Sequence, residues 1–541
     1  MALIAALLLS LFLTIVLTPV FSRLAMRLEM YDVPGPRKVH QRPIPRIGGL
    51  AMAIGAFASI VLWVPLDAMV RAYLIAALIL VASGMVDDWK GLGCKAKFAA
   101  QITAALIAIL YGDIRIVKLG ILLPDGVILA DWVSALLTLV AFVGVTNAIN
   151  LSDGLDGLAG GICMLSFCCI GYLAYVEQDF NIAILAAALV GAIFGFLRFN
   201  TFPATLFMGD TGSQLLGFSA IYFSLALTQG DTALSPLLPL IILGFPVLDT
   251  LTVMGERITK GRSPFAADKN HFHHRLMRMG LFHTESVFFI YVIQAFLIVS
   301  AFALRFYSEW LLLVSYLIFA GLVLAFFHWA DVTDWKFPRF NFIDRVIKGR
   351  LRVLRERGLF IMLAFRVVEW GVPLLLMISC LLPASIPSYF SAFASVLLGG
   401  LFLIFFFKKP WIKRAIIVSL YLFIPVLIYL SDTEVQIEEP LIRMYNLSFV
   451  FFLFFVLVTL RLTKRAKGFR LTPMDFLVLF ITLVFLVLPE LRLQYGLMAV
   501  KTIILFFCYE IIMGEVREKI GKVAVLTVAA YLVVVIRGMI G

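Results

Sequence analysis

The sequence predicts an all-α membrane protein that crosses the bilayer many times. Of its 541 residues, 62% are hydrophobic and only 14% are charged, whereas a soluble domain usually carries about 25% charged residues. Apolar runs of about 20 residues recur along the chain, and a helix of that length crosses the hydrocarbon with its backbone hydrogen bonds satisfied internally. Composition and run length together exclude an ordinary soluble globular protein.

The first part of the chain, residues 1–335, holds about eleven such runs by the helix-length criterion. The first run lacks the basic start and the small-residue cleavage site of a secretory signal, so we expect it to remain as a span. The expected spans are 2–22, 47–65, 72–86, 97–112, 132–148, 157–176, 182–198, 212–228, 234–254, 285–304 and 310–329.

Lys and Arg are unevenly divided between the loops that join these spans. They concentrate in 23–46, 87–96, 255–284 and 330–366, whereas the alternating loops hold few. Cytoplasmic loops carry the excess of basic residues in membrane proteins. We therefore expect the N-terminus outside the cell and the basic loops in the cytoplasm. The same bias accounts for the net charge of +12 without a nucleic-acid partner.

One loop on the expected outer side, 113–131, alternates apolar and polar residues on both sides of Pro124-Asp125-Gly126. Alternation around such a turn favours a short β-hairpin.

The remainder of the chain divides into a basic segment, 336–366, and a second apolar region, 367–541, with about seven further spans. In the basic segment apolar residues repeat at helical spacing among Arg and Lys. This pattern is typical of an interfacial helix on anionic headgroups, although an ordinary basic linker explains it equally well. The second apolar region carries no catalytic motif.

Acidic and amide side chains gather at the cytoplasmic ends of several spans. Ionisable groups at membrane depth are costly and usually functional, whereas single carboxylates near a helix N-terminus can simply act as caps. Several clusters on one face make capping alone an insufficient explanation. The residues concerned are Asp87, Asp88, Asn147, Asn150, Asp153, Asp156, Asp210 and Asp249.

Carboxylates that converge on one face repel one another unless a cation joins them. Mg²⁺ fits best, with Mn²⁺ as a substitute, because it takes oxygen ligands and is completed by substrate phosphates. The six cysteines show no metal-ligand or disulfide spacing and are interpreted as packing residues.

The most histidine-rich stretch is Asp268–Arg275, where His271, His273 and His274 make up half of the six histidines. His271 and His274 would share one helical face and could bind zinc, but the neighbouring Lys and Arg favour phosphate oxygens as the ligand. The first basic loop, 33–49, adds Lys38 among prolines and glycines that hold turns. Carboxylates for Mg²⁺ and cations for phosphates are the parts of phosphoryl transfer.

These motifs resemble the polyprenyl-phosphate N-acetylhexosamine-1-phosphate transferases of bacterial cell-envelope synthesis. More narrowly, they are similar to the undecaprenyl-phosphate GlcNAc-1-phosphate transferase type, sister of the phospho-N-acetylmuramoyl-pentapeptide transferase. The resemblance covers roughly residues 1–335. It rests on 32–40 with Gly48-Gly49, on Asp87-Asp88, and on the segments 147–157, 207–213 and 270–275.

The resemblance implies a Mg²⁺-dependent exchange at the cytoplasmic face. A UDP-N-acetylhexosamine would give its sugar 1-phosphate to undecaprenyl phosphate and release UMP, for polysaccharides such as cell wall or O antigen. It implies Asp87, Asp88, His271, His273 and His274 as catalytic residues, and Asp210 with Asp153 as metal ligands. The residues implied in substrate binding are Lys38, Asn147, Asn150, Asp153, Asp156, Phe207 and Arg275.

The histidine loop Asn270–Arg275 looks like that of the N-acetylglucosamine-type enzymes, which favours UDP-GlcNAc without separating it from other N-acetylhexosamines. For the chemistry we prefer direct attack by the lipid phosphate over a covalent intermediate on Asp87 or Asp88. The resemblance gives no role to 367–541, and a homodimer is left open. The alternative function is a secondary transporter that uses intramembrane carboxylates, but such proteins place them near the bilayer midplane.

Overall fold

The protein is described by a computed structural model that covers residues 2–33, 42–124, 127–230, 232–263, 270–337, 359–407, 411–433, 439–462, 497–515 and 520–540. Its contacts divide the chain into two compact units, with the boundary at Phe337 and Pro338. Among the described residues, nine helices are long and apolar enough to cross a membrane. The all-α polytopic fold expected from composition is confirmed.

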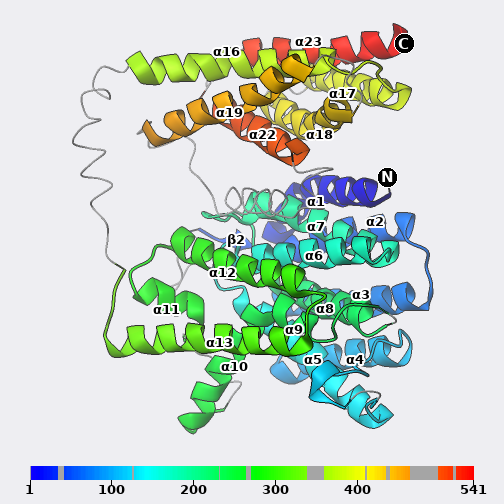
Figure 1. The fold of residues 1–541 in the computed structure, drawn as a ribbon, viewed down its shortest axis with the longest axis vertical. Coiled ribbons are helices and arrows are strands. Elements are labelled where there is room, and N and C mark those ends of the chain that lie inside the picture. The colour runs from blue at the N-terminus through cyan, green and yellow to red at the C-terminus, as the bar shows by residue number, and fades with distance from the viewer. Residues whose placement is uncertain are drawn as a thin grey trace. The chain divides into compact units, whose positions relative to one another are not determined.

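Each of the eleven apolar runs expected before residue 335 contains a helix. The helices of this first unit, coloured blue to green in Figure 1, are α1 (Ala2–Arg27), α2 (Gly48–Trp63), α3 (Ala68–Lys90), α4 (Cys94–Leu110), α5 (Asp131–Ser152), α6 (Leu158–Val176), α7 (Phe180–Asn200), α8 (Gly209–Thr228), α9 (Leu238–Ile242), α10 (Gly244–Thr259), α11 (Phe272–Arg278), α12 (His283–Leu304) and α13 (Glu309–Val332).

The run 234–254 was expected as one span but is broken at Leu243, where α9 ends and α10 begins. Pro246 has no N–H to donate to the carbonyl of Ile242, so an uninterrupted helix would leave that carbonyl without a partner. In the structure it accepts hydrogen bonds from Gln294 Nε2 (2.8 Å) and Ser166 Oγ (3.2 Å). Neighbouring helices therefore satisfy the backbone where the span is interrupted.

The centre of the first unit is α8, which packs against α2, α3, α5 and α6. Nearly all of its residues are buried, and its aromatic rings interlock with those of its neighbours. The Tyr73 ring of α3 lies 5.3 Å from Tyr222 and 4.9 Å from Phe223, and its hydroxyl is 2.8 Å from Ser219 Oγ. This packing fixes the position of the N-terminus of α8, where Asp210 stands.

The prediction of a β-hairpin at 113–131 is wrong for the described residues of that loop, 113–124 and 127–131. They form no strand; they contain a short 3₁₀ helix, η1 (Gly120–Leu122), and extended segments. The N–H groups of Val117 and Lys118 each donate to Gln229 Oε1 at 3.0 Å, and that of Ile116 donates to Thr138 Oγ1 at 2.8 Å. Side chains of α8 and α5 thus take the donors that a hairpin ladder would have used.

Two short strands form in the first basic loop, where no strand was expected. β1 (Tyr31–Asp32) pairs antiparallel with β2 (Ile44–Pro45), and Arg46 forms a parallel bridge with Phe207. The N–H of Phe207 donates to Pro45 O at 2.8 Å. The loop before α2 is therefore tied to the segment before α8.

The second unit contains six described helices, α16 (Leu359–Leu381), α17 (Ser388–Phe407), α18 (Ile412–Thr433), α19 (Glu439–Leu462), α22 (Leu497–Glu515) and α23 (Ile520–Ile540). Residues 463–496, where the rest of the expected spans would fall, lie outside the described residues. The basic pattern expected to form an interfacial helix falls in 338–358, also outside them.

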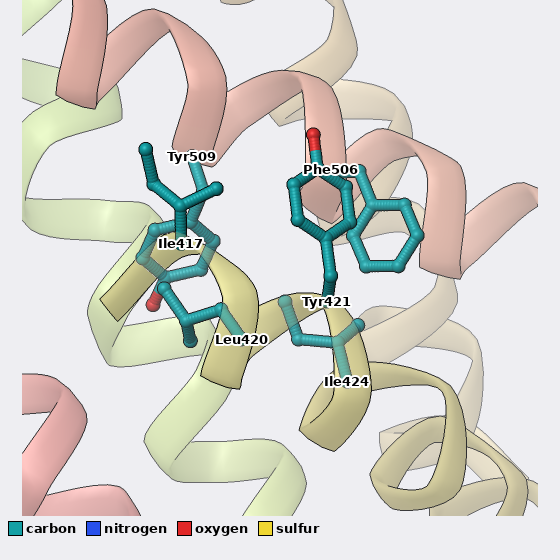
Figure 2. A pocket seen from close by; sticks show the side chains of 6 residues that line it. All are labelled: Ile417, Leu420, Tyr421, Ile424, Phe506 and Tyr509. Carbon is teal, nitrogen blue, oxygen red and sulfur yellow. The ribbon is translucent and has the colours of Figure 1, made fainter. Parts of the chain in front are cut away.

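The interior of the second unit is largely apolar. Phe423 stacks on Phe390 at 5.3 Å and packs on Tyr531 at 4.4 Å. A cavity of about 10 Å³ lies between α18 and α22 and has room for about one water molecule; Figure 2 shows the side chains that line it. We interpret it as a packing gap between these two helices, lined by Ile417, Leu420, Tyr421, Ile424, Phe506 and Tyr509.

Among the described residues of the second unit, the buried Lys501 of α22 forms an ion pair with Asp432 at the end of α18. The Lys501 ammonium lies 4.8 Å from the ring centre of Tyr445, and the Tyr445 hydroxyl is 2.8 Å from Ser379 Oγ. These polar contacts join α16, α18, α19 and α22.

Candidate active site

Asp87 and Asp88 occupy the last turn of α3. The helix ends because Gly91 adopts a positive φ of 70° and its N–H bonds back to Asp87 O. The Asp87 side chain accepts the N–H of Leu92 at 2.6 Å. The glycine-rich sequence after the two aspartates therefore folds the chain back over Asp87.

Asp88 reaches the N-terminus of α8. Its Oδ1 accepts the N–H of Asp210 at 2.9 Å, and its Oδ2 accepts the N–H and Oγ1–H of Thr211 at 3.1 and 2.7 Å. A carboxylate at this position satisfies donors that a helix start leaves free and complements the helix dipole. Asp88 therefore positions Asp210.

Close approach of α3 to α8 depends on glycine. A Cβ at Gly84 would lie 2.5 Å from the Cα of Thr211, and one at Gly209 would lie 2.4 Å from Asp88 Oδ2. Gly209 also has a positive φ of 72°, which favours glycine. The motif Phe207–Ser213 thus serves contact between helices as well as chemistry.

Asp87, Asp88 and Asp210 form one cluster, with ligand atoms that all lie within 4.8 Å of one another. Lys97 Nζ stands between two of them, 2.7 Å from Asp87 Oδ2 and 2.7 Å from Asp210 Oδ2. Oxygen ligands at this spacing suit a hard divalent cation. Asp153, also expected as a metal ligand, is not a member of this cluster.

Lys97 was missed in the sequence, where it seemed to begin an ordinary span. One signal was available: α4 begins at Cys94, and Lys95 and Lys97 stand in its first turn, where a positive charge opposes the helix dipole. A cation placed there against that preference indicates a nearby anion.

The amide side chains of Asn147 and Asn150 hold α5 to its neighbours. Asn147 Nδ2 donates to Gln101 Oε1 of α4 at 2.7 Å, and Asn150 Oδ1 accepts the hydroxyl of Ser213 of α8 at 2.8 Å. Both residues were expected to bind substrate. In the structure they join the helices that carry the carboxylates, and their role toward a substrate stays a prediction.

Asp153 follows the end of α5 and lies near the cluster. Burial is the largest cause that raises the pKa of Asp153 to about 7, and the negative charges of Asp210, Asp88 and Asp156 act in the same direction. The Arg46 guanidinium opposes this rise. These charge interactions place Asp153 and the start of α2 beside the cluster.

Asp156 forms hydrogen bonds to neighbouring segments through both its backbone and its side chain. Its Oδ2 accepts the N–H of Ala204 at 2.9 Å, and its own N–H donates to His283 Nε2 at 3.1 Å. The next N–H, of Gly157, donates to Asn200 Oδ1 at 2.9 Å. The segment 153–157 is thereby fixed to the ends of α7 and α12.

The histidine loop approaches this same segment. A Cβ at Gly154 would lie 2.4 Å from His273 Nε2, so the imidazole packs directly on the backbone there. The His271 and His273 rings are nearly parallel, 5.9 Å apart, and the His273 and His274 rings are 4.2 Å apart. Burial and then the neighbouring histidines hold the pKa of His273 well below its usual value.

His271 is oriented by Asp249 of α10. Its Nδ1 lies 2.9 Å from Asp249 Oδ2, and Asp249 Oδ1 accepts the N–H of Phe272 at 2.8 Å. Both groups are buried. With Nδ1 engaged, Nε2 is the ring nitrogen left for other partners.

The remaining expected residues have different positions. Arg275 is bonded to Glu256 and Asp331. Phe207 is half-buried and pairs through its backbone with Pro45 and Gly48. Lys38 lies outside the described residues.

The sequence model of the family described as glycosyl transferase family 4 matches residues 70–228. That range runs from α3 to α8 and includes Asp87, Asp88, Asp153, Asp156 and Asp210. The match therefore falls on the helices that build the carboxylate cluster.

Curated relatives extend the similarity. A protein of Bacillus subtilis (strain 168), named "Probable undecaprenyl-phosphate N-acetylglucosaminyl 1-phosphate transferase", is 35% identical over 330 residues, 60% of this chain and 92% of that protein. The undecaprenyl-phosphate alpha-N-acetylglucosaminyl 1-phosphate transferase of Escherichia coli (strain K12) is 34% identical over 62% of this chain and 91% of its own.

The decaprenyl-phosphate N-acetylglucosaminephosphotransferase of Mycobacterium leprae (strain TN) is 36% identical over 302 residues, which are 50% of this chain and 75% of that protein. The resemblance drawn from the motifs is confirmed. The chain belongs to glycosyl transferase family 4 and, within it, to the polyprenyl-phosphate N-acetylhexosamine-1-phosphate transferases.

Proposed function

We propose that this protein transfers N-acetylglucosamine 1-phosphate from UDP-GlcNAc to undecaprenyl phosphate and releases UMP, in the synthesis of a cell-envelope polysaccharide. The observation that carries the proposal is the meeting of Asp87, Asp88 and Asp210 from two helices, with Lys97 between two of them. The names of its relatives support undecaprenyl phosphate as the lipid and N-acetylglucosamine as the sugar.

Mg²⁺, with Mn²⁺ as a substitute, is the cofactor that we propose. The donor set consists of carboxylates alone, which suits a hard cation, and their ligand atoms lie within 4.8 Å of one another. Asp87 and Asp210 would hold the ion, since both oxygens of Asp88 already accept hydrogen bonds from α8. When bound, Mg²⁺ neutralises phosphate charge during phosphoryl transfer.

The reaction we propose is a single displacement. An oxygen of the lipid phosphate attacks the sugar-bound phosphorus of the UDP-sugar, and the bond from that phosphorus to the bridging oxygen breaks, so that UMP leaves. The lipid phosphate is already anionic and needs orientation more than activation. The engaged oxygens of Asp88 support this path over a covalent intermediate on that residue.

On the donor side, the histidine loop and the segment 153–157 are the groups that we assign to the nucleotide and sugar. His271, oriented by Asp249, would donate its Nε2–H to a phosphate oxygen. His273 packs against Gly154 and would remain neutral at pH 7, given its lowered pKa.

We place the site at the cytoplasmic face of the bacterial inner membrane. The carboxylates stand at helix ends beside the basic loops, and the positive-inside bias puts such loops in the cytoplasm. UDP-sugars are made on that side. A transporter would instead need its carboxylates near the middle of the spans, and Asp87 and Asp210 lie within one turn of a helix end.

The deciding experiment is UMP release by the purified full-length protein from a panel of UDP-sugars, with undecaprenyl phosphate and Mg²⁺ each present or omitted. We expect UMP from UDP-GlcNAc only when all components are present. UMP from UDP-N-acetylmuramoyl-pentapeptide instead would refute the substrate. No UMP from any donor, together with solute uptake into proteoliposomes, would refute the class.

A further inference from the structure

Arg275 is held by protein groups at all three of its guanidinium nitrogens. Its Nε donates to Asn270 O at 2.9 Å, its Nη1 donates to Asp331 Oδ2 at 3.2 Å, and its Nη2 pairs with Glu256 Oε1. The side chain is only 7% exposed. The sequence suggested a phosphate contact here, but the structure surrounds the guanidinium with acceptors of its own.

These contacts join three separate elements. Glu256 belongs to α10, Asp331 to α13 and Arg275 to α11, which carries the histidines. Glu256 also accepts from Asn270 Nδ2 at 3.4 Å, so the start of the histidine loop is held twice. We call Arg275, Glu256 and Asp331 the arginine clamp.

Aromatic rings of α11 and α13 stack beside the arginine clamp. The Phe272 ring of α11 lies 4.5 Å from Phe327 of α13 with an angle of 6° between the planes, and the Arg275 guanidinium lies over the same Phe327 ring at 5.9 Å. The N–H of Phe337 donates to Met279 O at 2.9 Å. A helix as short as α11 has little stability of its own, so these contacts determine its position.

Electrostatics disfavour Arg275 as a ligand for the substrate phosphates. Its charge is already opposed by two carboxylates, and a phosphate would have to approach against both of them. The Arg275 side chain is buried, so separating it from its carboxylates would leave a buried charge without a partner, which is strongly unfavourable. The histidines two and four residues earlier face Gly154 and Asp249 instead.

We propose that the arginine clamp positions His271 and His273 for the transfer, and that Arg275 acts through them rather than on the substrate. This role rests on the proposed function for its kinetic consequence. Its structural consequence, the fixed placement of α11, does not. Asp331 is a positioning residue on the same grounds, although it lies outside the histidine motif.

The kinetic test compares Arg275→Gln, Asp331→Asn and the double variant in the full-length protein, with UDP-GlcNAc and undecaprenyl phosphate varied separately. We expect kcat to fall roughly 10–100-fold, the scale on which slight misplacement of reacting groups acts, while both KM values stay near those of the wild type. The double variant should be no slower than Arg275→Gln, because residues of one network are not additive.

The matched control is Asp334→Asn, the same change three residues along the chain. Asp334 is 87% exposed and, among the residues that the structure describes, forms its ion pair with the exposed Lys336, so we expect wild-type kinetics from this variant. Arg275→Lys should recover only part of the activity, since an ammonium cannot reproduce the fork that reaches both carboxylates.

A second readout needs no turnover. Diethyl pyrocarbonate acylates imidazoles, and mass spectrometry reports the rate at each histidine. His271 and His273 are 4% and 3% exposed, and we expect both to be acylated faster in Arg275→Gln and Asp331→Asn but not in Asp334→Asn. If the wild type releases no UMP, the proposed function fails, and these rates still test the clamp.

The opposite pattern would overturn the inference. A phosphate contact predicts a raised KM for UDP-GlcNAc in Arg275→Gln, wild-type behaviour in Asp331→Asn, and unchanged acylation rates in both. Unchanged acylation of His271 and His273 in both variants would by itself reject a positioning role.

Discussion

Three neighbouring carboxylates have different partners and therefore different roles. Asp88 is saturated by donors from the first turn of α8, whereas Asp87 and Asp210 share the Lys97 ammonium. The hydrogen bonds of Asp88 hold α3 against α8, whereas Asp87 and Asp210 provide negative charge that a metal ion could bind. Chemically identical side chains one residue apart are thus separated in function by their hydrogen bonds.

The cluster gives the first prediction. Asp210→Asn and Asp87→Asn should each reduce UMP release by about 100-fold or more, the scale of a lost electrostatic contact at a reacting centre. Asp113→Asn, in the loop between α4 and α5 where the carboxylate is 79% exposed, should leave release unchanged. Wild-type turnover in both cluster variants would remove Asp87 and Asp210 from the reaction.

The second prediction concerns pH and His273. Because the pKa of His273 is lowered by burial, the folded protein binds a proton there less readily than the unfolded chain. Its contribution to stability is therefore present above the unfolded pKa of about 6.5 and is lost as the pH falls below it, by at most about 1.4 kcal/mol per pH unit.

The measurement is the unfolding temperature between pH 7.5 and 5.5, followed by tryptophan fluorescence. The wild type should lose stability toward pH 5.5, and His273→Gln should lose less because it has no imidazole to protonate. An identical pH slope in the two proteins would show that His273 is accessible to protons in the folded state.

At the scale of the helices, glycine sets how closely α2, α3 and α8 can approach. A Cβ at Gly49 would lie 2.1 Å from the backbone N of Gly212. Backbone atoms cannot relieve such a clash by changing rotamer, so the helix itself would have to shift. The N–H of Gly49 also donates to Met208 O at 2.9 Å. The position of α8, and with it Asp210, is therefore sensitive to one methyl group on α2.

The third prediction follows from this contact. Gly49→Ala should destabilise the protein by about 1–3 kcal/mol, as overpacking does, and should slow turnover by displacing α8. Gly144→Ala is the control: nothing lies within 4 Å of a Cβ there, and alanine is the better helix former. Equal unfolding temperatures for Gly49→Ala and the wild type would contradict the close packing.

Apolar run length located the helices of the first unit except the short α11, because a helix that crosses the hydrocarbon needs such a run. It could not detect the break at Leu243, which depends on Pro246 and on acceptor satisfaction by Gln294 and Ser166. Alternation misled at 113–131 for a related reason: the donors of that loop are taken by Gln229 and Thr138, far away in sequence.

The site was predictable where residue type alone limits the chemistry. Asp87, Asp88 and Asp210 were expected on one face because unpaired carboxylates at membrane depth are rare, and the structure brings these three together without Asp153. Lys97 and the arginine clamp were not expected, since their partners lie far from them in the sequence. The assignment of Arg275 to a phosphate rested on the motif resemblance and on charge, and neither reveals which acceptors lie nearest to the guanidinium.

For the whole molecule, the described residues of the site all belong to the first unit. The Bacillus subtilis relative is matched over 92% of its length by 60% of this chain, so a protein of that size can be complete without a counterpart of the rest. The second unit has its own apolar core.

The fourth prediction is that a chain ending at residue 358, before α16, retains the transferase activity. Its kcat and KM should stay within about threefold of the full-length values, since a compact unit with its own core can fold alone. UMP release by the two purified chains is the measurement. Loss of turnover in a truncated chain that remains monodisperse would assign the second unit a part in catalysis.

Lys97 has one more consequence for how the site is maintained. Between turnovers, the carboxylates of α3 and α8 share a positive charge that the chain itself supplies, so repulsion between them does not push the two helices apart. A cation that binds Asp87 and Asp210 would therefore displace the Lys97 ammonium from these two carboxylates. When the cation leaves, Lys97 can pair with them again, so α3 and α8 would keep their positions between one turnover and the next.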